Sequence, residues 1–105
     1  MRTGIHPYIY PMLIRIVKMT FQPEKVGDFI AAFESRKELI AAFEGCSGVD
    51  LLRDMGQTNI FFTYSKWQNE TALEKYRQSE LFQSTWNEVK QWFNDKPGAW
   101  SVTKL

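Results

Sequence analysis

The stretch Thr63–Phe93, TYSKWQNETALEKYRQSELFQSTWNEVKQWF, decides the fold of this chain. It begins as an aromatic-rich strand that ends at Trp67 and leads directly into helical sequence. Asn69 is a good N-cap for a helix from Glu70 through Tyr76, and Ser79 restarts the helix. Few small folds use a strand end, a cap and an interrupted amphipathic helix in this order, so the stretch fixes the architecture better than any other part.

The restarted helix carries an apolar stripe and then ends abruptly. Its apolar residues recur at the i, i+4, i+7 spacing of one helix face. They are Phe82, Trp86, Val89 and Phe93. Lys96-Pro97-Gly98 breaks the helix, and we expect residues 99–105 to form the last strand.

The chain upstream of this stretch predicts a strand followed by a long helix. Residues 12–21, MLIRIVKMTF, are largely apolar, with Arg15 and Lys18 on opposite faces of the pleat. Pro23 suits the first position of a helix. The apolar residues that follow have helical spacing, and Gly45 is a natural helix stop.

Two short strands follow this helix and complete the element order. Residues 49–55 and 59–67 are separated by a turn at Gly56-Gln57, which predicts an antiparallel hairpin. The order is then strand, helix, two strands, helix, strand. This is the ferredoxin-like βαββαβ arrangement of the α+β class. Right-handed crossovers place both helices on one face of a four-stranded antiparallel sheet.

The opposite face of the predicted sheet is the reason to expect a dimer. Every strand also contributes apolar side chains to that face, and a lone domain would leave them in water. A homodimer that stacks sheet on sheet would cover them. We expect one domain over residues 12–105, preceded by an N-terminal extension, residues 1–11.

Composition excludes several classes of function. Thirteen basic and twelve acidic residues give a net charge of +1, which predicts no nucleic-acid partner and no membrane partner. His6 is the only histidine, which argues against a metal site built on several imidazoles. Cys46 is the only cysteine and is expected to pack as a small residue. The cytoplasm is the expected location.

The motifs together resemble the antibiotic biosynthesis monooxygenase (ABM) family of dimeric α/β barrels. The resemblance covers residues 12–105 and rests on short motifs in a shared order. They are Pro23-Glu24, Glu44-Gly45-Cys46, Trp67, Asn69, Ala72-Leu73, Ser79 and Phe82. It implies a dimer, and for some members a cofactor-independent oxygenase acting on a small aromatic or quinol-like molecule.

The heme-degrading branch of that family is not the expected one. The resemblance sets its iron-binding histidine at Trp86, its strand asparagine at Lys18 and its helix tryptophan at Tyr76. Trp does not ligate iron, so we expect neither heme nor any other cofactor.

Candidate site residues follow from what a cofactor-free oxygenase needs, namely a dry aromatic cavity, a proton-handling group and donors for an oxyanion. Tyr76 is the first candidate for proton handling, and Lys18 for the oxyanion. Five residues are candidates for binding the substrate: Trp67, Trp86, Tyr64, Asn59 and Phe82. Arg15 is the other charge in this strand, and we expect it to form an ion pair with Asp50 or Asp54 across the dimer.

Each candidate also has a structural interpretation. Tyr76 would pack its ring and turn its hydroxyl to water, Trp67 and Trp86 would be core residues, and Lys18 would extend its amine to solvent. Quinol oxygenases of the family often have a histidine where Tyr76 stands. Its absence favours the alternative function, a non-catalytic dimeric module that binds a small ligand.

Overall fold

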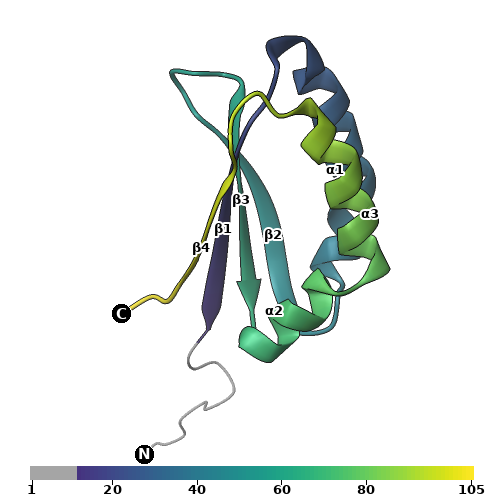
Figure 1. Cartoon of the computed structure of the whole chain (residues 1–105). Coiled ribbons are helices and arrows are strands. Elements are labelled where there is room, and N and C mark those ends of the chain that lie inside the picture. Colours follow the sequence, from purple (N-terminus) through teal and green to yellow (C-terminus); the bar gives the residue numbers. More distant parts are fainter. Residues whose placement is uncertain (1–11) are drawn as a thin grey trace, which may run out of the picture.

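The computed structural model describes residues 12–105, and its element order matches the predicted one (Figure 1). The expected extension, residues 1–11, lies outside the described residues. The elements are β1 (Leu13–Thr20), η2 (Pro23–Lys25), α1 (Val26–Ala41), β2 (Cys46–Arg53), β3 (Ile60–Trp67), α2 (Glu70–Arg77), α3 (Glu80–Val89), η3 (Lys90–Trp92) and β4 (Gly98–Val102).

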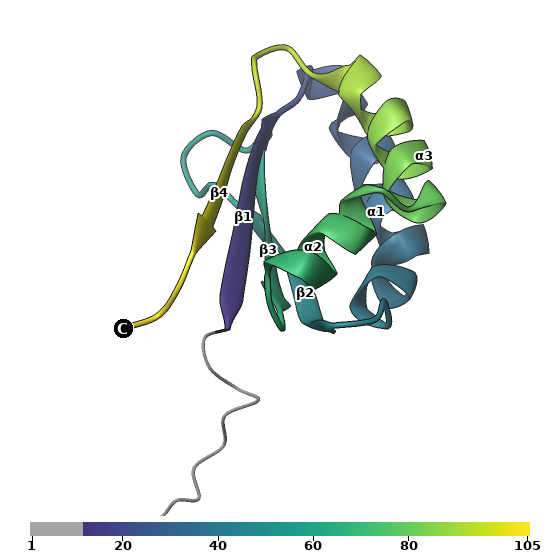
Figure 2. The same ribbon diagram turned by 60° about the horizontal axis from the view of Figure 1, so that its bottom comes forward.

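The sheet has the strand order β2-β3-β1-β4, and every neighbouring pair is antiparallel. Figures 1 and 2 show α1, α2 and α3 on one side of this sheet, and no helix of residues 12–105 covers the other side. The predicted α+β, ferredoxin-like fold is therefore confirmed.

Alternation along β1 divides the sheet into two faces. Met19 is buried in the core and Val17 packs against it, so these residues face the helices. Arg15 has the same parity and lies on that face. Ile16 and Lys18 have the other parity and lie on the uncovered face, which we call the open face.

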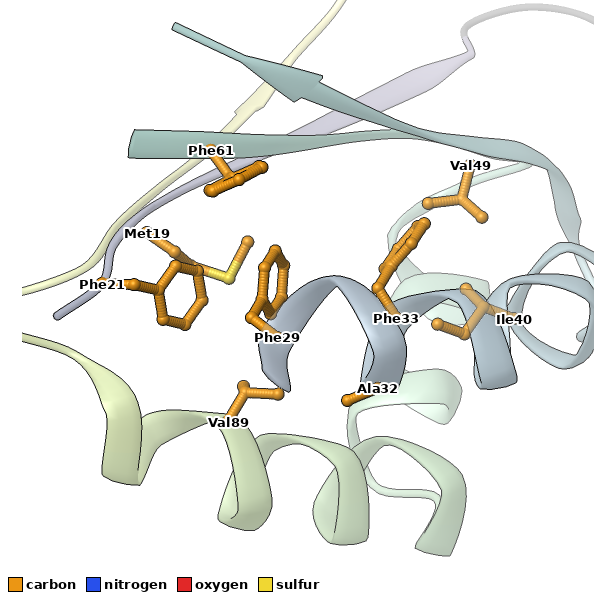
Figure 3. Close-up of a cluster of buried hydrophobic side chains, with 9 residues drawn as sticks. All are labelled: Met19, Phe21, Phe29, Ala32, Phe33, Ile40, Val49, Phe61 and Val89. Atoms are coloured by element: carbon orange, nitrogen blue, oxygen red, sulfur yellow. The ribbon is translucent and has the colours of Figure 1, made fainter. Parts of the chain in front are cut away.

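The helices pack on the sheet through aromatic side chains. Pro23 opens the 3-10 turn η2, after which α1 buries one face. Figure 3 shows Phe29 and Phe33 of α1 between their helix and the strands, with Phe61 of β3 above Phe29. Phe21 stacks on Phe29 at a centroid distance of 4.1 Å. The rings lock α1 onto the sheet because large buried aromatics contribute most to core packing.

The break between α2 and α3 follows from two caps. The Asn69 side chain accepts a hydrogen bond from the Ala72 backbone N–H, at 2.9 Å, and starts α2. Ser79 Oγ accepts from the Phe82 N–H at 3.2 Å and starts α3. Ser79 also donates to the Tyr76 carbonyl at 2.6 Å, which joins the end of one helix to the start of the next. Both predicted caps are present.

The element boundaries differ from the prediction around Gly45. Helix α1 ends at Ala41, and β2 begins at Cys46 rather than at Val49. Gly45 has φ +84°, and a Cβ there would lie 2.5 Å from the Ala72 Cβ, so the chain turns where only glycine fits. A register irregularity between Cys46 and Gly48 lets β2 start early.

The last strand is also shorter than predicted. It ends at Val102 instead of Leu105. Val102 pairs with Ile14, and β1 begins only one residue earlier, so the chain beyond Val102 runs past the end of its neighbour.

Candidate functional site

A cavity of about 310 Å³ lies between the helices and the helix-facing side of the sheet. All four strands and all three α-helices contribute to its wall. Most of the wall is apolar, including Phe29, Phe33 and Ile40 of α1 and Val49 of β2. The cavity is at the small end of the range for ligand pockets, and it has their usual composition of apolar walls with a few polar points.

One side of the cavity is formed by a ladder of aromatic rings from α2 and α3. Tyr76 contacts Phe82 edge to face at a centroid distance of 5.2 Å, and Phe82 stacks on Trp86 at 5.9 Å. At the Tyr76 end of the ladder, the Trp67 ring stacks on the Tyr76 ring at a centroid distance of 4.9 Å. The helix break sets this arrangement, because it turns Tyr76 and Phe82 toward each other across the Ser79 cap.

Tyr76 is the phenol of the cavity, and burial raises the pKa of its hydroxyl well above the ordinary value near 10. The nearby Cys46 raises the pKa further. At neutral pH the side chain is therefore a neutral phenol that donates or accepts a hydrogen bond. It is not a base.

Trp67 lies behind the wall and is fully buried. Its Nε1–H donates to Ser65 Oγ at 2.8 Å, and Ser65 Oγ lies 3.5 Å from the Arg15 carbonyl oxygen. The indole N–H is thus already used by the protein. Trp67 supports Tyr76 and fixes the Ser65 hydroxyl, but does not line the cavity itself.

Two guanidinium groups complete the polar part of the wall. Arg15 comes from β1 and donates to Ser101 Oγ of β4 at 2.9 Å. Arg77 comes from the end of α2 and pairs with Glu74 at 3.0 Å. Burial lowers the pKa of Arg15, and the charge of Arg77 lowers it further. Arg15 stays protonated because an arginine loses its proton only far above neutral pH.

The structure brings together three of the predicted site residues, since Tyr76, Phe82 and Trp86 line the cavity. Asn59 lies elsewhere and donates its amide to the Phe21 carbonyl at 2.9 Å, which ties β3 to the end of β1. Tyr64 pairs with Ile16 and lies on the open face.

Lys18 lies on the open face, which corrects the expectation that it would act from the pocket side. It pairs with Phe62 and Gly98 on the open face, because it has the opposite parity to Met19. Arg15 lines the cavity instead, whereas Asp50 lies on the open face. The carboxylate of Asp54, the other expected partner, accepts hydrogen bonds from the turn that follows β2.

Arg15 and Arg77 are the residues that sequence reasoning missed as cavity residues. The alternation along β1 correctly placed Arg15 and Lys18 on opposite faces of the strand. Both faces of β1 are apolar, so nothing in the pattern showed which face the helices would cover.

The described residues contain neither a cluster of metal ligands nor a membrane-spanning helix. Within residues 12–105, no three His, Cys, Asp or Glu side chains gather as a metal ion would require. None of the helices in this part of the chain has the length and apolar character needed to cross a membrane.

The family model described as antibiotic biosynthesis monooxygenase matches residues 12–87 of the chain. The chain belongs to this family. The ABM protein is 28% identical over 72 residues to YcnE of Bacillus subtilis strain 168, named a putative monooxygenase. That match covers 69% of this chain and 76% of YcnE.

Solved structures agree with the ABM fold. A conserved protein from Methanosarcina mazei Go1 has a TM-score of 0.85 at 19% identity, covering 90% of this chain and 94% of that one. PA3566 from Pseudomonas aeruginosa has a TM-score of 0.82 at 18% identity, covering 92% and 97%. At these identities the likeness concerns the fold of the ABM domain.

Proposed function

We propose that this ABM protein oxygenates a small aromatic or quinol-like substrate in the cavity, without a cofactor. The observation that carries the proposal is the largely apolar cavity walled by Tyr76, Phe82 and Trp86. Flat aromatic walls suit a flat electron-rich ring, and apolar surroundings strengthen each polar contact made there.

The chemistry needs only the substrate and molecular oxygen. A CH₂ group flanked by a carbonyl-bearing aromatic system, as in an anthrone, loses a proton to give a delocalised anion that reacts with O₂. Two C–H bonds break and a C=O bond forms, a four-electron oxidation of the carbon. One oxygen atom enters the product, and the other leaves as water with the two hydrogens, so O₂ accepts the four electrons.

Tyr76 suits the role of a neutral donor to the oxyanion of this anion. Its raised pKa means that it keeps its proton while it donates a hydrogen bond. The titratable side chains of the described cavity wall are Arg15, Tyr76 and Arg77, and none is a base at neutral pH. We therefore expect the substrate proton to pass to water, which restricts substrates to compounds that are themselves acidic.

A homodimer is part of the proposal. The open face carries apolar side chains from all four strands, and three of them are substantially exposed: Leu52, Trp100 and Val102. Stacking a second copy on this face would remove them from water.

The alternative is a dimeric module that binds a small ligand without reacting. The absence of a base in the described wall of the cavity favours it. A buried aromatic pocket with neutral and cationic polar groups is sufficient for binding.

Oxygen uptake by chelator-treated protein tests the proposal, with a panel of hydroquinones, naphthols and anthrones. We expect protein-dependent uptake that falls about 100- to 1,000-fold in Tyr76→Phe, since one oxyanion donor is removed. Tyr64→Phe makes the same chemical change on the open face and should keep the rate. Uptake that survives in Tyr76→Phe would reject its role. Binding of these compounds by calorimetry without any uptake would establish the alternative.

A further inference from the structure

The cavity combines apolar walls with two guanidinium groups, against which the described residues place one carboxylate. Arg15 lies in the middle of the sheet, in β1, on the face covered by the helices. Within residues 12–105, its side chain donates a hydrogen bond to the Ser101 hydroxyl at 2.9 Å. A guanidinium carries five N–H donors, so most of them are available to a ligand.

Arg15 makes no ion pair with a carboxylate within 4.0 Å in the described structure. Ion pairs within 4.0 Å among residues 12–105 are made by Lys25, Arg36, Lys75 and Arg77. A half-buried cation without a contacting counter-ion is unfavourable because it loses hydration that a single hydrogen bond replaces only in part. Such a charge is compatible with folding, and it becomes favourable when a ligand supplies the opposite charge.

The second guanidinium does not remove this excess. Arg77 lines the same cavity but already pairs with Glu74 at 3.0 Å. Gln78 donates to the other Glu74 oxygen at 2.6 Å, and the Glu74 carboxylate lies near enough to Arg15 to attract its charge without forming an ion pair with it. The Arg77 and Glu74 charges cancel, and the charge of Arg15 remains. The group of three therefore has a net charge of +1.

We propose that the cavity takes an aromatic carboxylic acid, with the carboxylate on Arg15 and the rings against the ladder of Tyr76, Phe82 and Trp86. A monoanion matches the single excess charge, whereas a dianionic phosphate would leave a net negative charge in an apolar site. A carboxylate also matches the planar fork of a guanidinium, which binds both oxygens. The inference rests on the proposed function in that it concerns the ligand of the same cavity.

The position of Arg15 explains how the acid would be oriented. Arg15 lies on the sheet, and the ladder lies on α2 and α3 opposite. A ligand anchored on β1 would therefore extend its ring system toward Tyr76, which is the group proposed to hold the oxyanion. Binding energy from the remote carboxylate would then position the reacting carbon.

Calorimetry under anaerobic conditions tests this with 1-hydroxy-2-naphthoic acid and its methyl ester, which differ in the charge. We expect the wild-type protein to bind the acid about 10-fold or more tightly than the ester. Arg15→Gln keeps a donor for Ser101 but removes the charge, and should reduce this preference to about one. Arg53→Gln is the matched control, because Arg53 lies over the Phe61 ring and donates to the Thr58 carbonyl without lining the cavity.

Three results would overturn the inference. They are equal wild-type affinities for acid and ester, an intact preference in Arg15→Gln, and no binding of the acid at millimolar concentration. If Arg15→Gln does not fold, the salt dependence of the wild type decides: added salt should weaken binding of the acid and not of the ester, and equal effects would reject a charge contact.

The same measurements separate this inference from the proposed reaction. An acid preference that depends on Arg15, with no oxygen uptake from any compound, would leave the inference standing and remove the oxygenase. Turnover of both the ester and the acid, bound with equal affinity, would support the oxygenase and reject the inference.

Discussion

The indole of Trp67 lies flat on the phenol ring of Tyr76, with the ring centroids 4.9 Å apart and the planes at 28°. This contact joins the last residue of β3 to the last turn of α2. It covers one face of the phenol, while Phe43 and Phe82 contact the ring at its edges. The burial that raises the pKa of Tyr76 is thus produced by a specific set of neighbouring rings.

Because the pKa of Tyr76 is raised, the stability of the folded protein should fall at alkaline pH. The folded state holds the proton more tightly than the unfolded chain, where a tyrosine titrates near 10. The stabilisation is complete below pH 10 and is lost as the pH rises above it, because only the unfolded chain then releases the proton. We expect the free energy of unfolding to fall by up to about 1.4 kcal/mol per pH unit above pH 10 from this residue.

Urea titrations at pH 8 and pH 11 measure this effect by difference. Tyr76→Phe should lose less stability between the two pH values than the wild type, and Tyr64→Phe should behave like the wild type. Equal losses in wild type and Tyr76→Phe would show that the phenol titrates normally in the folded protein.

Gly45 and Gly27 should respond in opposite directions to the same substitution. Gly45→Ala forces a left-handed backbone on alanine and brings a Cβ within 2.5 Å of the Ala72 Cβ, so we expect a loss of about 1–3 kcal/mol. Gly27 lies in α1 with open space around its Cβ position, and Gly27→Ala should stabilise by about 0.5–1 kcal/mol. Thermal denaturation of both variants gives the comparison, and two changes of the same sign would contradict it.

Ser79 should matter more than a neighbouring serine of the same helix. Ser79→Ala removes the cap of α3 and the hydrogen bond to the Tyr76 carbonyl, so we expect a loss of about 1 kcal/mol. Ser84 is exposed and bonds only the preceding turn, through the Leu81 carbonyl, so Ser84→Ala should be within about 0.5 kcal/mol of wild type. Urea denaturation measures the stability of both variants. Equal losses would mean that the Ser79 cap does not stabilise the junction between α2 and α3.

The open face should control the oligomeric state. Trp100 is 50% exposed on the open face, and Trp100→Glu would place a charge in the proposed contact between copies. We expect light scattering to show a dimer for the wild type and a monomer for Trp100→Glu at micromolar concentration. Leu39→Glu makes a similar change at an exposed position of α1, 61% exposed, and should remain dimeric. A monomeric wild type would remove the argument for a dimer.

The fold was predictable because local signals agree with one another. The caps at Asn69 and Ser79, the turn at 56–57 and the periods of the apolar residues each indicated the same element order. The start of β2 was not predictable, because it depends on the close approach of Gly45 to Ala72, which are far apart in the sequence.

The cavity was harder to predict than the fold. The sequence identified Tyr76 because it lies near the helix break, and Phe82 and Trp86 because they lie on the apolar stripe of the restarted helix. It could not distinguish Arg15 from Lys18 as the buried cation, since apolar residues occupy both faces of β1. The distinction depends on which face the helices cover, and that is set by the crossover of the whole chain.

The ring ladder also gives the protein an optical signature. Tyr76 and Trp67 are two chromophores held in van der Waals contact at a fixed angle, and Phe82 continues the array to Trp86. Coupled transitions in such a chiral array produce near-ultraviolet circular dichroism that isolated side chains lack. The signal reports whether α2 is seated on the end of β3, so the docking of this short helix can be followed in solution without any attached label.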